Sequence, residues 1–379
     1  MEDKQMLMIP GPTPVPEKVL QALGTHPIGH RSGDFSKVIA EINQNLKWLH
    51  QTENEVLSLN VSGTGAMEAG MINFLSPGDR VLVGVNGKFG DRWAQICEVF
   101  GLQTERITAD WGTPLDTEEI RSKLEADTNK EIKAVVITHS ETSAGVLNDL
   151  ETINKHVKAH GEALIIVDAV TSLGAYNLPI DELGLDVVAS GSQKGYMIPP
   201  GLGFISVSDK AWKAYETSKF PRFYMDLGKY KKANAKDSTP FTPPINLMYG
   251  LQVALQMMQR EGLENIFARH ARLTQATRAA VKAIGLELFA PDDAASTAVT
   301  AIKSDDAEAI RSTMRKKYDI ALAGGQDHLK GKVFRIGHLG FISDRDILMT
   351  ISCLEATLIE LGHDFDAKAG VKAAAAALV

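Results

Sequence analysis

The sequence predicts an α/β fold with a mostly parallel sheet covered by helices on both faces, followed by a smaller α+β domain. Two observations predict the sheet: apolar runs of strand length alternate with amphipathic stretches of helix length, and the apolar runs are continuous. A third observation, a long polar and irregular segment over residues 220–244, interrupts this alternation. We therefore expect the second domain to follow that segment.

Six apolar runs have the length and composition of buried strands: Glu55–Leu59, Val81–Val85, Ile132–Thr138, Ala163–Val167, Val187–Ser190 and Leu202–Val207. Between them, apolar residues recur at helical spacing in Ser36–Gln51, Asp91–Phe100 and Asp116–Glu125. A sheet built this way binds ligands beyond the carboxyl ends of its strands, so that edge is where we look for chemistry.

The beginning and the end of the chain have different patterns. Pro10-Gly11-Pro12-Thr13-Pro14-Val15-Pro16 cannot form a helix or a central strand, which predicts an extended arm lying on another part of the protein. Asn246–Arg260 predicts a long helix, and the helical pattern resumes toward Ile284. We expect an N-terminal arm over 1–17, a large domain over 18–258 and a small domain over 259–379. The small domain includes apolar segments at Thr297–Ile302 and Val333–Ile336 and ends in a frayed alanine-rich helix at Lys368–Val379.

Composition excludes several classes of protein. The chain of 379 residues has 40 Lys+Arg against 47 Asp+Glu. A net charge of −7 argues against binding to nucleic acid or to an anionic membrane. Cys97 and Cys353 are far apart, which argues against a disulfide framework and a cysteine-based metal site. The start, Met1-Glu2-Asp3-Lys4, does not resemble a signal peptide, and no apolar run reaches the about 18 residues of a membrane helix. We expect a cytoplasmic protein without a metal.

Three segments place reactive residues after predicted strands. The first is Val61-Ser62-Gly63-Thr64-Gly65, which precedes the helical run Ala66–Leu75. Glycines and hydroxyls at a helix N-terminus present free N–H groups and the positive end of the helix dipole, which suits a phosphate. A capped helix start with a tight turn explains the same residues, and both interpretations stay open.

The second segment, Ile165-Ile166-Val167-Asp168, ends a buried strand in a carboxylate. A buried carboxylate is costly without a partner, so Asp168 is a helix cap, a metal ligand or the counter-ion of a cationic ring nitrogen. The third segment, Ala189–Gly195, places Lys194 among small residues just past a strand. Desolvation there would lower its pKa and expose the amine as a nucleophile, whereas the ordinary alternative is a solvated surface charge. An anion cradle, a carboxylate and a lysine are together what pyridoxal phosphate (PLP) needs.

In the order of these motifs the chain resembles the class V aminotransferases of fold type I, closest to the alanine–glyoxylate and serine–glyoxylate group. The resemblance covers nearly the whole chain and rests on ordered matches: Pro10-Gly11-Pro12, Ser62-Gly63-Thr64, Asn86-Gly87, His139-Ser140-Glu141-Thr142-Ser143-Ala144-Gly145-Val146, Asp168-Ala169-Val170-Thr171-Ser172, Ser190-Gly191-Ser192-Gln193-Lys194, Thr239–Thr242 and Val333-Phe334-Arg335-Ile336-Gly337. It implies a seven-stranded, mostly parallel sheet in the large domain and a homodimer with its active sites at the subunit interface.

The resemblance also implies a role for each matching residue. Lys194 would form the Schiff base with PLP, and Asp168 would pair with the protonated ring nitrogen. Arg335 would bind the substrate carboxylate. The remaining cofactor contacts would be Ser62, Gly63, Thr64 and Gln193 at the phosphate, Phe89 and Val170 on the two ring faces, Thr142 near the ring oxygen, and Thr239 and Thr242 reaching the phosphate from the other subunit.

Two positions depart from some relatives, which have Trp where this chain has Phe89 and Tyr where it has Thr239. An aromatic ring is kept at the first position, so stacking should persist. A threonine reaches less far than a tyrosine, so the cross-subunit contact is the least secure of the implied roles. His30-Arg31 is as readily a structural turn as a site element, and the lysine-bearing loop 220–244 is expected to be a solvated face or a dimer contact.

The expected function is a PLP-dependent aminotransferase that moves the amino group of alanine or serine to glyoxylate by a ping-pong mechanism, as in glycine biosynthesis or photorespiration. Other class V enzymes are alternatives: a phosphoserine aminotransferase, or a desulfurase, whose nucleophilic cysteine is missing from Gly324-Gly325-Gln326-Asp327-His328. A redox or hydrogenase-associated subunit is disfavoured, because two isolated cysteines cannot ligate an iron–sulfur cluster. A non-catalytic protein on an inherited fold is a further alternative.

Overall fold

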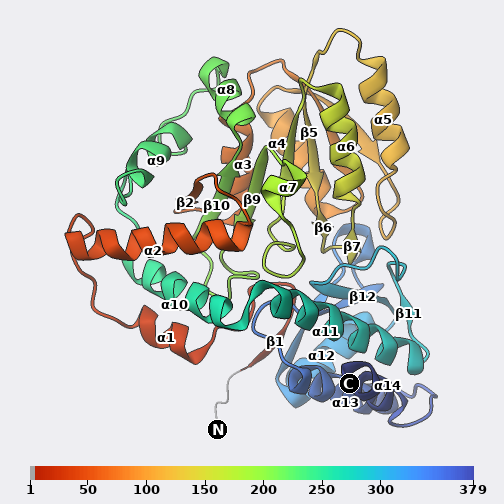
Figure 1. Cartoon of the computed structure of the whole chain (residues 1–379). Helices are drawn as coiled ribbons and strands as arrows, with labels where there is room; N and C mark the ends of the chain where they lie inside the picture. Colours follow the sequence, from red (N-terminus) through yellow and green to blue (C-terminus); the bar gives the residue numbers. More distant parts are fainter. Residues whose placement is uncertain (1–4) are drawn as a thin grey trace.

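Two sheets organise the computed structural model, which describes residues 5–379 (Figure 1). The first four residues of the predicted arm lie outside the described residues. The larger sheet has seven strands in the order β2-β10-β9-β8-β5-β3-β4. All neighbouring pairs are parallel except those of β10, which runs antiparallel to both β9 and β2. The expected seven-stranded, mostly parallel sheet is confirmed. Its strands are β2 (Val56–Leu59), β3 (Arg80–Val85), β4 (Gln103–Thr108), β5 (Ile132–Thr138), β8 (Leu164–Asp168), β9 (Val187–Gly191) and β10 (Gly203–Val207).

Strand β4 is the one strand of this sheet that the sequence pattern missed. Its sequence, Gln-Thr-Glu-Arg-Ile-Thr, is mostly polar, and of its six residues only Ile107 is buried. It lies at the sheet edge and pairs only with β3. An edge strand exposes side chains that a central strand buries, so it lacks the continuous apolar run by which the other six were recognised.

Helices cover both faces of the large sheet because successive strand residues point to opposite sides. In β5, Val135 and Ile137 belong to one hydrophobic cluster, and Ala134 and Val136 belong to the other. The first cluster includes α2 (Gly33–His50), α5 (Thr117–Ala126), α6 (Leu150–His160) and α10 (Ile245–Glu261). The second includes α3 (Gly63–Ile72), α4 (Lys88–Val99), α8 (Asp209–Thr217) and α9 (Leu227–Asn234).

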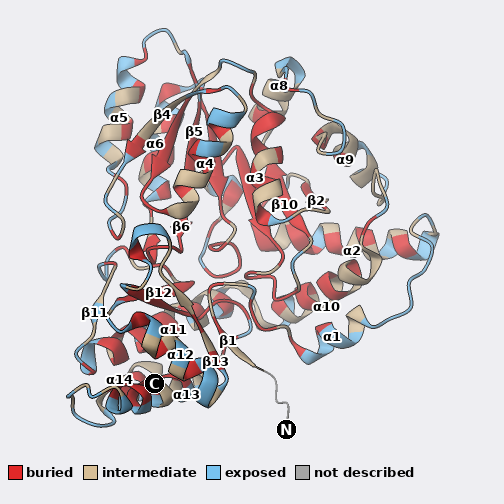
Figure 2. Cartoon of the chain, turned by 180° about the vertical axis from the view of Figure 1, so that it is seen from behind, coloured by how far each residue is buried: buried red, intermediate tan, exposed pale blue. Residues whose placement is uncertain are grey.

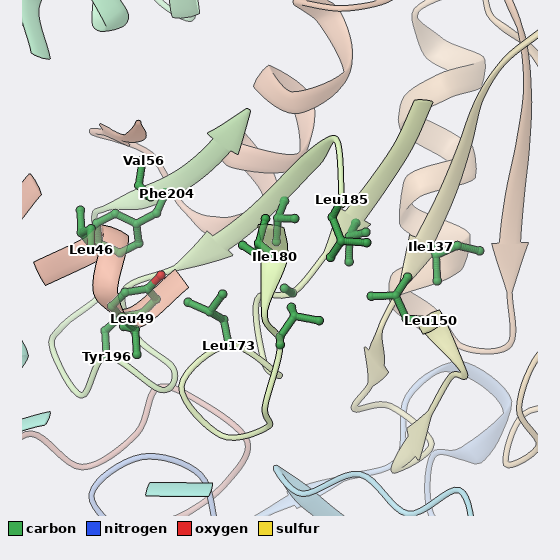
Figure 3. Close-up of a cluster of buried hydrophobic side chains, with 14 of the residues drawn as sticks. Leu46, Leu49, Val56, Ile137, Leu150, Leu173, Ile180, Leu185, Tyr196 and Phe204 are labelled. Atoms are coloured by element: carbon green, nitrogen blue, oxygen red, sulfur yellow. The ribbon is translucent and has the colours of Figure 1, made fainter. Parts of the chain in front are cut away.

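The first of these clusters packs helix α2 against the large sheet. Figure 3 shows part of it, with Leu46 and Leu49 of α2 beside Phe204 of β10 and Tyr196. Burial is nearly complete along the central strands, and exposed residues gather on loops and outer helix faces (Figure 2). This packing makes the carboxyl ends of the strands a rigid edge on which side chains can be positioned.

The second sheet has five strands in the order β1-β13-β14-β12-β11. They are β1 (Met6–Met8), β11 (Glu287–Leu288), β12 (Val299–Lys303), β13 (Ile320–Gly324) and β14 (Val333–Gly337). Helices α11 (Leu263–Ala283), α12 (Ala307–Tyr318), α13 (Asp344–Glu360) and α14 (Ala369–Leu378) share its apolar core. The predicted boundary between 258 and 259 falls in the last turn of α10, before Gly262, and stays a prediction.

The remaining elements are short: α1 (Glu17–Leu23), the hairpin of β6 (Ser140–Glu141) and β7 (Val146–Leu147), α7 (Ile180–Leu183) and a 3-10 turn at Asp327–Leu329. In the segment 220–244, the expectation of an irregular loop was wrong in part, since α9 forms within it and Asp226 caps its first turn. Its buried apolar residues are few, Leu227 and Tyr230, and the lysines around them obscure the helical pattern.

The expectation of a frayed C-terminal helix was also wrong. Helix α14 packs against α11 and α13, and Ala374 is fully buried. The Gly370 N–H donates to Glu355 Oε1 of α13 at 2.7 Å. Alanine-rich sequence alone does not show which face is buried, because every side chain of the run is small and apolar.

Replacing Ala374 by Asp is expected to lower the free energy of unfolding by about 3 kcal/mol, because it buries a carboxylate without a partner. The matched control is Ala375→Asp, one residue along on an exposed position, where we expect a change within about 0.5 kcal/mol. Urea unfolding of both variants measures the difference. Equal effects at the two positions would mean that the helix is frayed after all.

Candidate active site

Lys194 lies three residues beyond β9, at the carboxyl edge of the large sheet, and only 9% of it is exposed. Its Nζ donates to the carbonyl of Pro10 at 2.7 Å. The Thr13 hydroxyl donates to the Lys194 carbonyl at 3.0 Å, and the Thr13 N–H donates to the Gln193 carbonyl at 3.1 Å. The proline-rich segment is therefore laid over the lysine by backbone and side-chain hydrogen bonds.

The arm approaches Lys194 so closely that position 11 must be glycine. Gly11 has φ +133°, a conformation that L side chains rarely adopt, and a Cβ there would lie 2.6 Å from Lys194 Nζ. Burial lowers the pKa of Lys194 to about 8, with smaller contributions from the positive charges of Arg335 and Arg92 and an opposing one from Asp168. Near neutral pH this lysine supplies far more neutral amine than a surface lysine.

Asp168 is the last residue of β8 and is 4% exposed. Its Oδ1 accepts the N–H of Val170 at 2.9 Å, so one oxygen serves as a local cap. Burial raises the pKa of Asp168 to about 7, and the nearby charge of Glu141 raises it further, while the Val170 hydrogen bond and the charge of Lys194 oppose this. The cap explains one oxygen and leaves the second available to a ligand.

Helix α3 begins in the same region. Ser62 is its N-cap and accepts the Gly65 N–H at 3.4 Å, so the alternative of a capped helix start is correct for Ser62. Gly63 and Thr64 are the first two helical residues, whose N–H groups have no acceptor within a helix. The cap therefore leaves the N–H groups of Gly63 and Thr64 available to an anion.

Glycines bring the remaining residues of this terminus together. A Cβ on Gly63 would lie 3.1 Å from a methyl group of Val170, and one on Gly191 would lie 3.2 Å from Gln193 Oε1 and 3.3 Å from the Gly63 Cα. Gln193 Oε1 is buried and has no hydrogen-bond partner among the described residues. An unpaired acceptor beside a helix N-terminus is a group that a ligand donor would satisfy.

Phe89 is the second residue of α4, and its ring faces a cation from its own helix. The Arg92 guanidinium lies 4.9 Å from the centroid of the Phe89 ring and donates to Thr64 Oγ1 at 3.0 Å. Arg92 thus joins the start of α4 to the start of α3. Its charge also influences the pKa values of Lys194 and Asp168, which places it within electrostatic range of both.

Arg335 lies in the middle of β14 and is 6% exposed. Its Nη1 donates to the Thr142 carbonyl at 2.7 Å, while Nε and Nη2 donate to the Gly324 carbonyl at 2.9 and 2.7 Å. Burial lowers the pKa of Arg335 to about 10, and the charge of Glu141 acts against it. A guanidinium has five N–H donors, so these bonds fix its plane and leave donors for a carboxylate.

Within the described chain, Thr239 and Thr242 do not join the site residues around Lys194. They lie between α9 and α10, where the Thr239 hydroxyl donates to the Phe241 carbonyl at 2.7 Å and the Thr242 carbonyl accepts from Asn60 Nδ2 at 2.9 Å. Arg31 donates to Ser238 Oγ at 2.8 Å and to the Thr239 carbonyl at 2.5 Å, so the His30-Arg31 stretch contributes a brace for this loop.

Sequence reasoning missed three contributors: Glu141, Arg92 and the Pro10 carbonyl. Arg92 could have been found, since it lies three residues after Phe89 and so on the same helix face. Glu141 lies in the His139–Val146 motif, which assigns it no role. Only its burial in the folded chain shows that its carboxylate needs partners. A backbone carbonyl such as that of Pro10 carries no signal in the sequence.

These residues fit the chemistry of PLP. A desolvated amine, a buried carboxylate with a free oxygen and a helix N-terminus with free N–H groups match its aldehyde, ring nitrogen and phosphate ester. Within residues 5–379, three or more His, Cys, Asp or Glu side chains nowhere gather as a metal site would need. In the same range, no helix combines the length and the apolar character of a membrane-spanning segment.

Comparison with known proteins agrees with this chemistry. The family model described as aminotransferase class V matches residues 6–337. The L-aspartate–glyoxylate aminotransferase of Paracoccus denitrificans is 38% identical over 380 residues, covering 99% of this chain and 96% of that protein. The serine–glyoxylate aminotransferase of Methylorubrum extorquens is 38% identical over 383 residues, covering 98% and 95%. A soluble hydrogenase 42 kDa subunit of Anabaena cylindrica is 68% identical over 378 residues, 99% of each chain.

Solved structures give the same result for the fold. The alanine–glyoxylate aminotransferase of Nostoc sp. has a TM-score of 0.89 and 32% identity, covering 94% of this chain and 96% of that one. The pyridoxamine–pyruvate aminotransferase of Mesorhizobium loti has a TM-score of 0.94 and 28% identity, covering 99% and 97%. The expected fold type and the cofactor, PLP, are confirmed. With its family model matched over most of its length, this chain belongs to the class V aminotransferases.

Proposed function

We propose that this enzyme moves the amino group of a small amino acid, alanine or serine, to glyoxylate. The observation that carries the proposal is the buried Lys194 amine, held at the sheet edge with Asp168 and Arg335 within electrostatic range. The names of two relatives and one structural neighbour give three different amino donors: aspartate, serine and alanine. All three names give glyoxylate as the acceptor. That shared partner supports glyoxylate as the acceptor.

Arg335 is proposed to bind the substrate carboxylate. Three of its five donors are held by backbone carbonyls, so its fork is preorganised and loses little freedom when a carboxylate binds. A bidentate contact fixes the direction of the substrate Cα–H bond. The groups that accept these hydrogen bonds are backbone carbonyls of β13 and of the β6–β7 hairpin. They fix the guanidinium plane without a carboxylate that would compete with the substrate.

Lys194 is proposed to bind the cofactor aldehyde and then, once the substrate amine replaces it, to move a proton from the substrate Cα. A pKa lowered to about 8 suits both tasks, because the neutral amine is the nucleophile and the base. PLP, when bound, supplies a ring that accepts the electrons left at Cα. Asp168, with its free carboxylate oxygen, would keep a proton at the ring nitrogen. The first product, an oxo acid, leaves before the second substrate binds, so the cycle is ping-pong.

A homodimer is part of the proposal. Thr242 is exposed, and the nearby Phe223 and Tyr224 are 72% and 40% exposed around Phe241. Exposed aromatic side chains gathered in this way mark an interaction surface. We assign Thr239 and Thr242 to the phosphate of a second subunit, as the family resemblance implies, and Ser62, Gly63, Thr64, Gln193, Val170, Phe89 and Thr142 to cofactor contacts within one subunit. A cytoplasmic location stays a prediction.

A redox function is the second candidate, because the name of the Anabaena relative describes a hydrogenase subunit. The two cysteines of this chain are Cys97, which is buried, and Cys353, which lies in the other half of the sequence. Hydrogen-dependent dye reduction by the purified chain would favour this candidate. Turnover of an amino donor with glyoxylate by the same preparation would favour the aminotransferase.

The identity of the donor is tested by titrating the visible absorbance of the purified enzyme. Alanine, serine, aspartate, glycine or glutamate is added alone, followed by glyoxylate. We expect alanine or serine to remove the cofactor band and glyoxylate to restore it, which records both half-reactions. A band that responds to aspartate and not to alanine or serine would replace the proposed donor, and a protein that binds no PLP would overturn the assignment.

Lys194→Ala is expected to lose turnover by more than about 10³-fold and to lose the visible band of the lysine-bound cofactor, because the nucleophile and the proton carrier are both removed. Bound PLP should persist through its phosphate contacts. Lys155→Ala, at a lysine of α6 that is paired only with Glu151, is the control and should keep full activity. An active Lys194 variant would disprove its role.

The pH dependence of PLP capture tests the electrostatics of the same lysine. With the pKa of Lys194 at about 8, the rate at which apoenzyme captures PLP should rise with pH through a midpoint near 8, since only the neutral amine attacks. The charge of Asp168 raises that pKa, so Asp168→Asn should move the midpoint lower. Stopped-flow absorbance between pH 6 and 10 (about the range where the amine titrates) measures both. A midpoint near that of a free lysine would contradict the burial argument.

A further inference from the structure

Glu141 is a fully buried carboxylate in β6 whose two oxygens receive four donors. Oε2 accepts the N–H groups of Phe89 at 2.9 Å and Gly90 at 3.0 Å. Oε1 accepts the N–H of Ser143 at 3.1 Å and its hydroxyl at 2.6 Å. An ionised carboxylate offers about four acceptor positions, so these contacts saturate it.

The geometry is that of the ionised form. The three backbone N–H groups can only donate, and the Ser143 hydroxyl donates to Oε1 while its oxygen accepts the Lys88 N–H at 2.9 Å. A protonated carboxyl group could donate only to the Ser143 oxygen and would then lose the hydroxyl as a donor, so the ionised form is the one that keeps all four contacts. Burial raises the pKa of Glu141 and outweighs the hydrogen bonds from Ser143, Gly90 and Phe89, which lower it.

These contacts cap helix α4 from another part of the chain. Its N-cap is Gly87, which has no side chain, so the first N–H groups of the helix, those of Lys88, Phe89 and Gly90, are satisfied by Ser143 and Glu141 instead. A Cβ on Gly87 would lie 2.2 Å from Glu141 Cγ, so the glutamate occupies the space of the missing side chain. The backbone that carries the Phe89 ring is therefore positioned by Glu141 and Ser143.

The same carboxylate is connected to Arg335. The residue after it, Thr142, accepts the Arg335 Nη1 hydrogen bond through its carbonyl. The charge of Glu141 also raises the pKa of Arg335, against the lowering that burial causes. One hairpin thus fixes the start of α4 on one side and the guanidinium on the other.

We propose that Glu141 is a positioning residue for transamination, whose ionised carboxylate holds the Phe89 ring and the Arg335 guanidinium in one arrangement. The inference rests on the proposed roles of Phe89 at the cofactor ring and of Arg335 at the substrate carboxylate. Glu141 itself touches backbone groups and Ser143, and it acts through those two residues. Without its charge, cofactor orientation and carboxylate binding should both suffer.

A purely structural cap is the competing explanation, and the chain offers a matched control for it. Asp127 is also a buried carboxylate that accepts two backbone N–H groups, those of Ile132 at 2.7 Å and Glu131 at 3.1 Å. It lies before β5, at the end of the strand away from Lys194. Asp127→Asn therefore disturbs a comparable buried carboxylate, which is also 3.1 Å from His160 Nε2, without touching the site.

The experiment compares Glu141→Gln, Ser143→Ala and Asp127→Asn in the holoenzyme. An amide at 141 points N–H groups at backbone N–H groups, so we expect the PLP dissociation constant of the apoenzyme and the KM of the amino donor each to rise by about tenfold. The visible circular dichroism per bound PLP, which reports ring orientation, should fall. Ser143→Ala should change all three in the same direction by a smaller factor, and it serves as the milder variant if Glu141→Gln folds poorly. Asp127→Asn should change thermal stability alone.

The proposal is overturned if Glu141→Gln keeps wild-type circular dichroism, PLP affinity and KM, or if Asp127→Asn reproduces its losses. In either case the glutamate is only a cap. If the wild-type protein binds no PLP or transaminates no donor, the proposed function itself is wrong. That result is distinct from a failure of the Glu141 proposal.

Discussion

The burial of the Lys194 ammonium group is the constraint on which the site depends. A charged amine taken out of water is costly unless it is paired or gives up its proton. Here the Pro10 carbonyl accepts from it and Asp168 lies near enough to favour its charged form, yet burial still lowers its pKa to about 8. The result is a lysine that is reactive near neutral pH and is shielded by its own chain terminus.

Three parts of the chain must meet for this to happen. The β9 strand brings Lys194 to the sheet edge, β8 brings Asp168 to the same edge, and the Pro10–Thr13 segment closes over Lys194. The arm can lie there because β1 joins the smaller sheet through β13, next to the strand that carries Arg335. Lys194 and Arg335 are thereby tied to one another through backbone pairing.

Glu141 adds a second buried charge, and it links regions that are distant in sequence. It organises the start of α4, and its neighbour Thr142 anchors Arg335. Saturated with donors, such a carboxylate is rigid, because moving it leaves several N–H groups unpaired at once. That rigidity is what a site needs in order to hold a ring and a carboxylate in a fixed relation. Arg92 extends the same framework to Thr64 and α3.

The family resemblance pointed to Arg335, whereas the residue pattern of the sequence by itself determined the class of fold, six of the seven strands in the large sheet, and Lys194 and Asp168 as residues to examine. It could do so because continuous apolar runs and small residues after strands are local signals. It missed β4 and mistook α14 for a frayed end, since neither shows in its own composition which face is buried. Only the tertiary structure decided how Pro10, Glu141 and Arg92 enter the site. Their roles consist of contacts between residues far apart in the chain, and burial, which gives those contacts their strength, is a property of the folded whole.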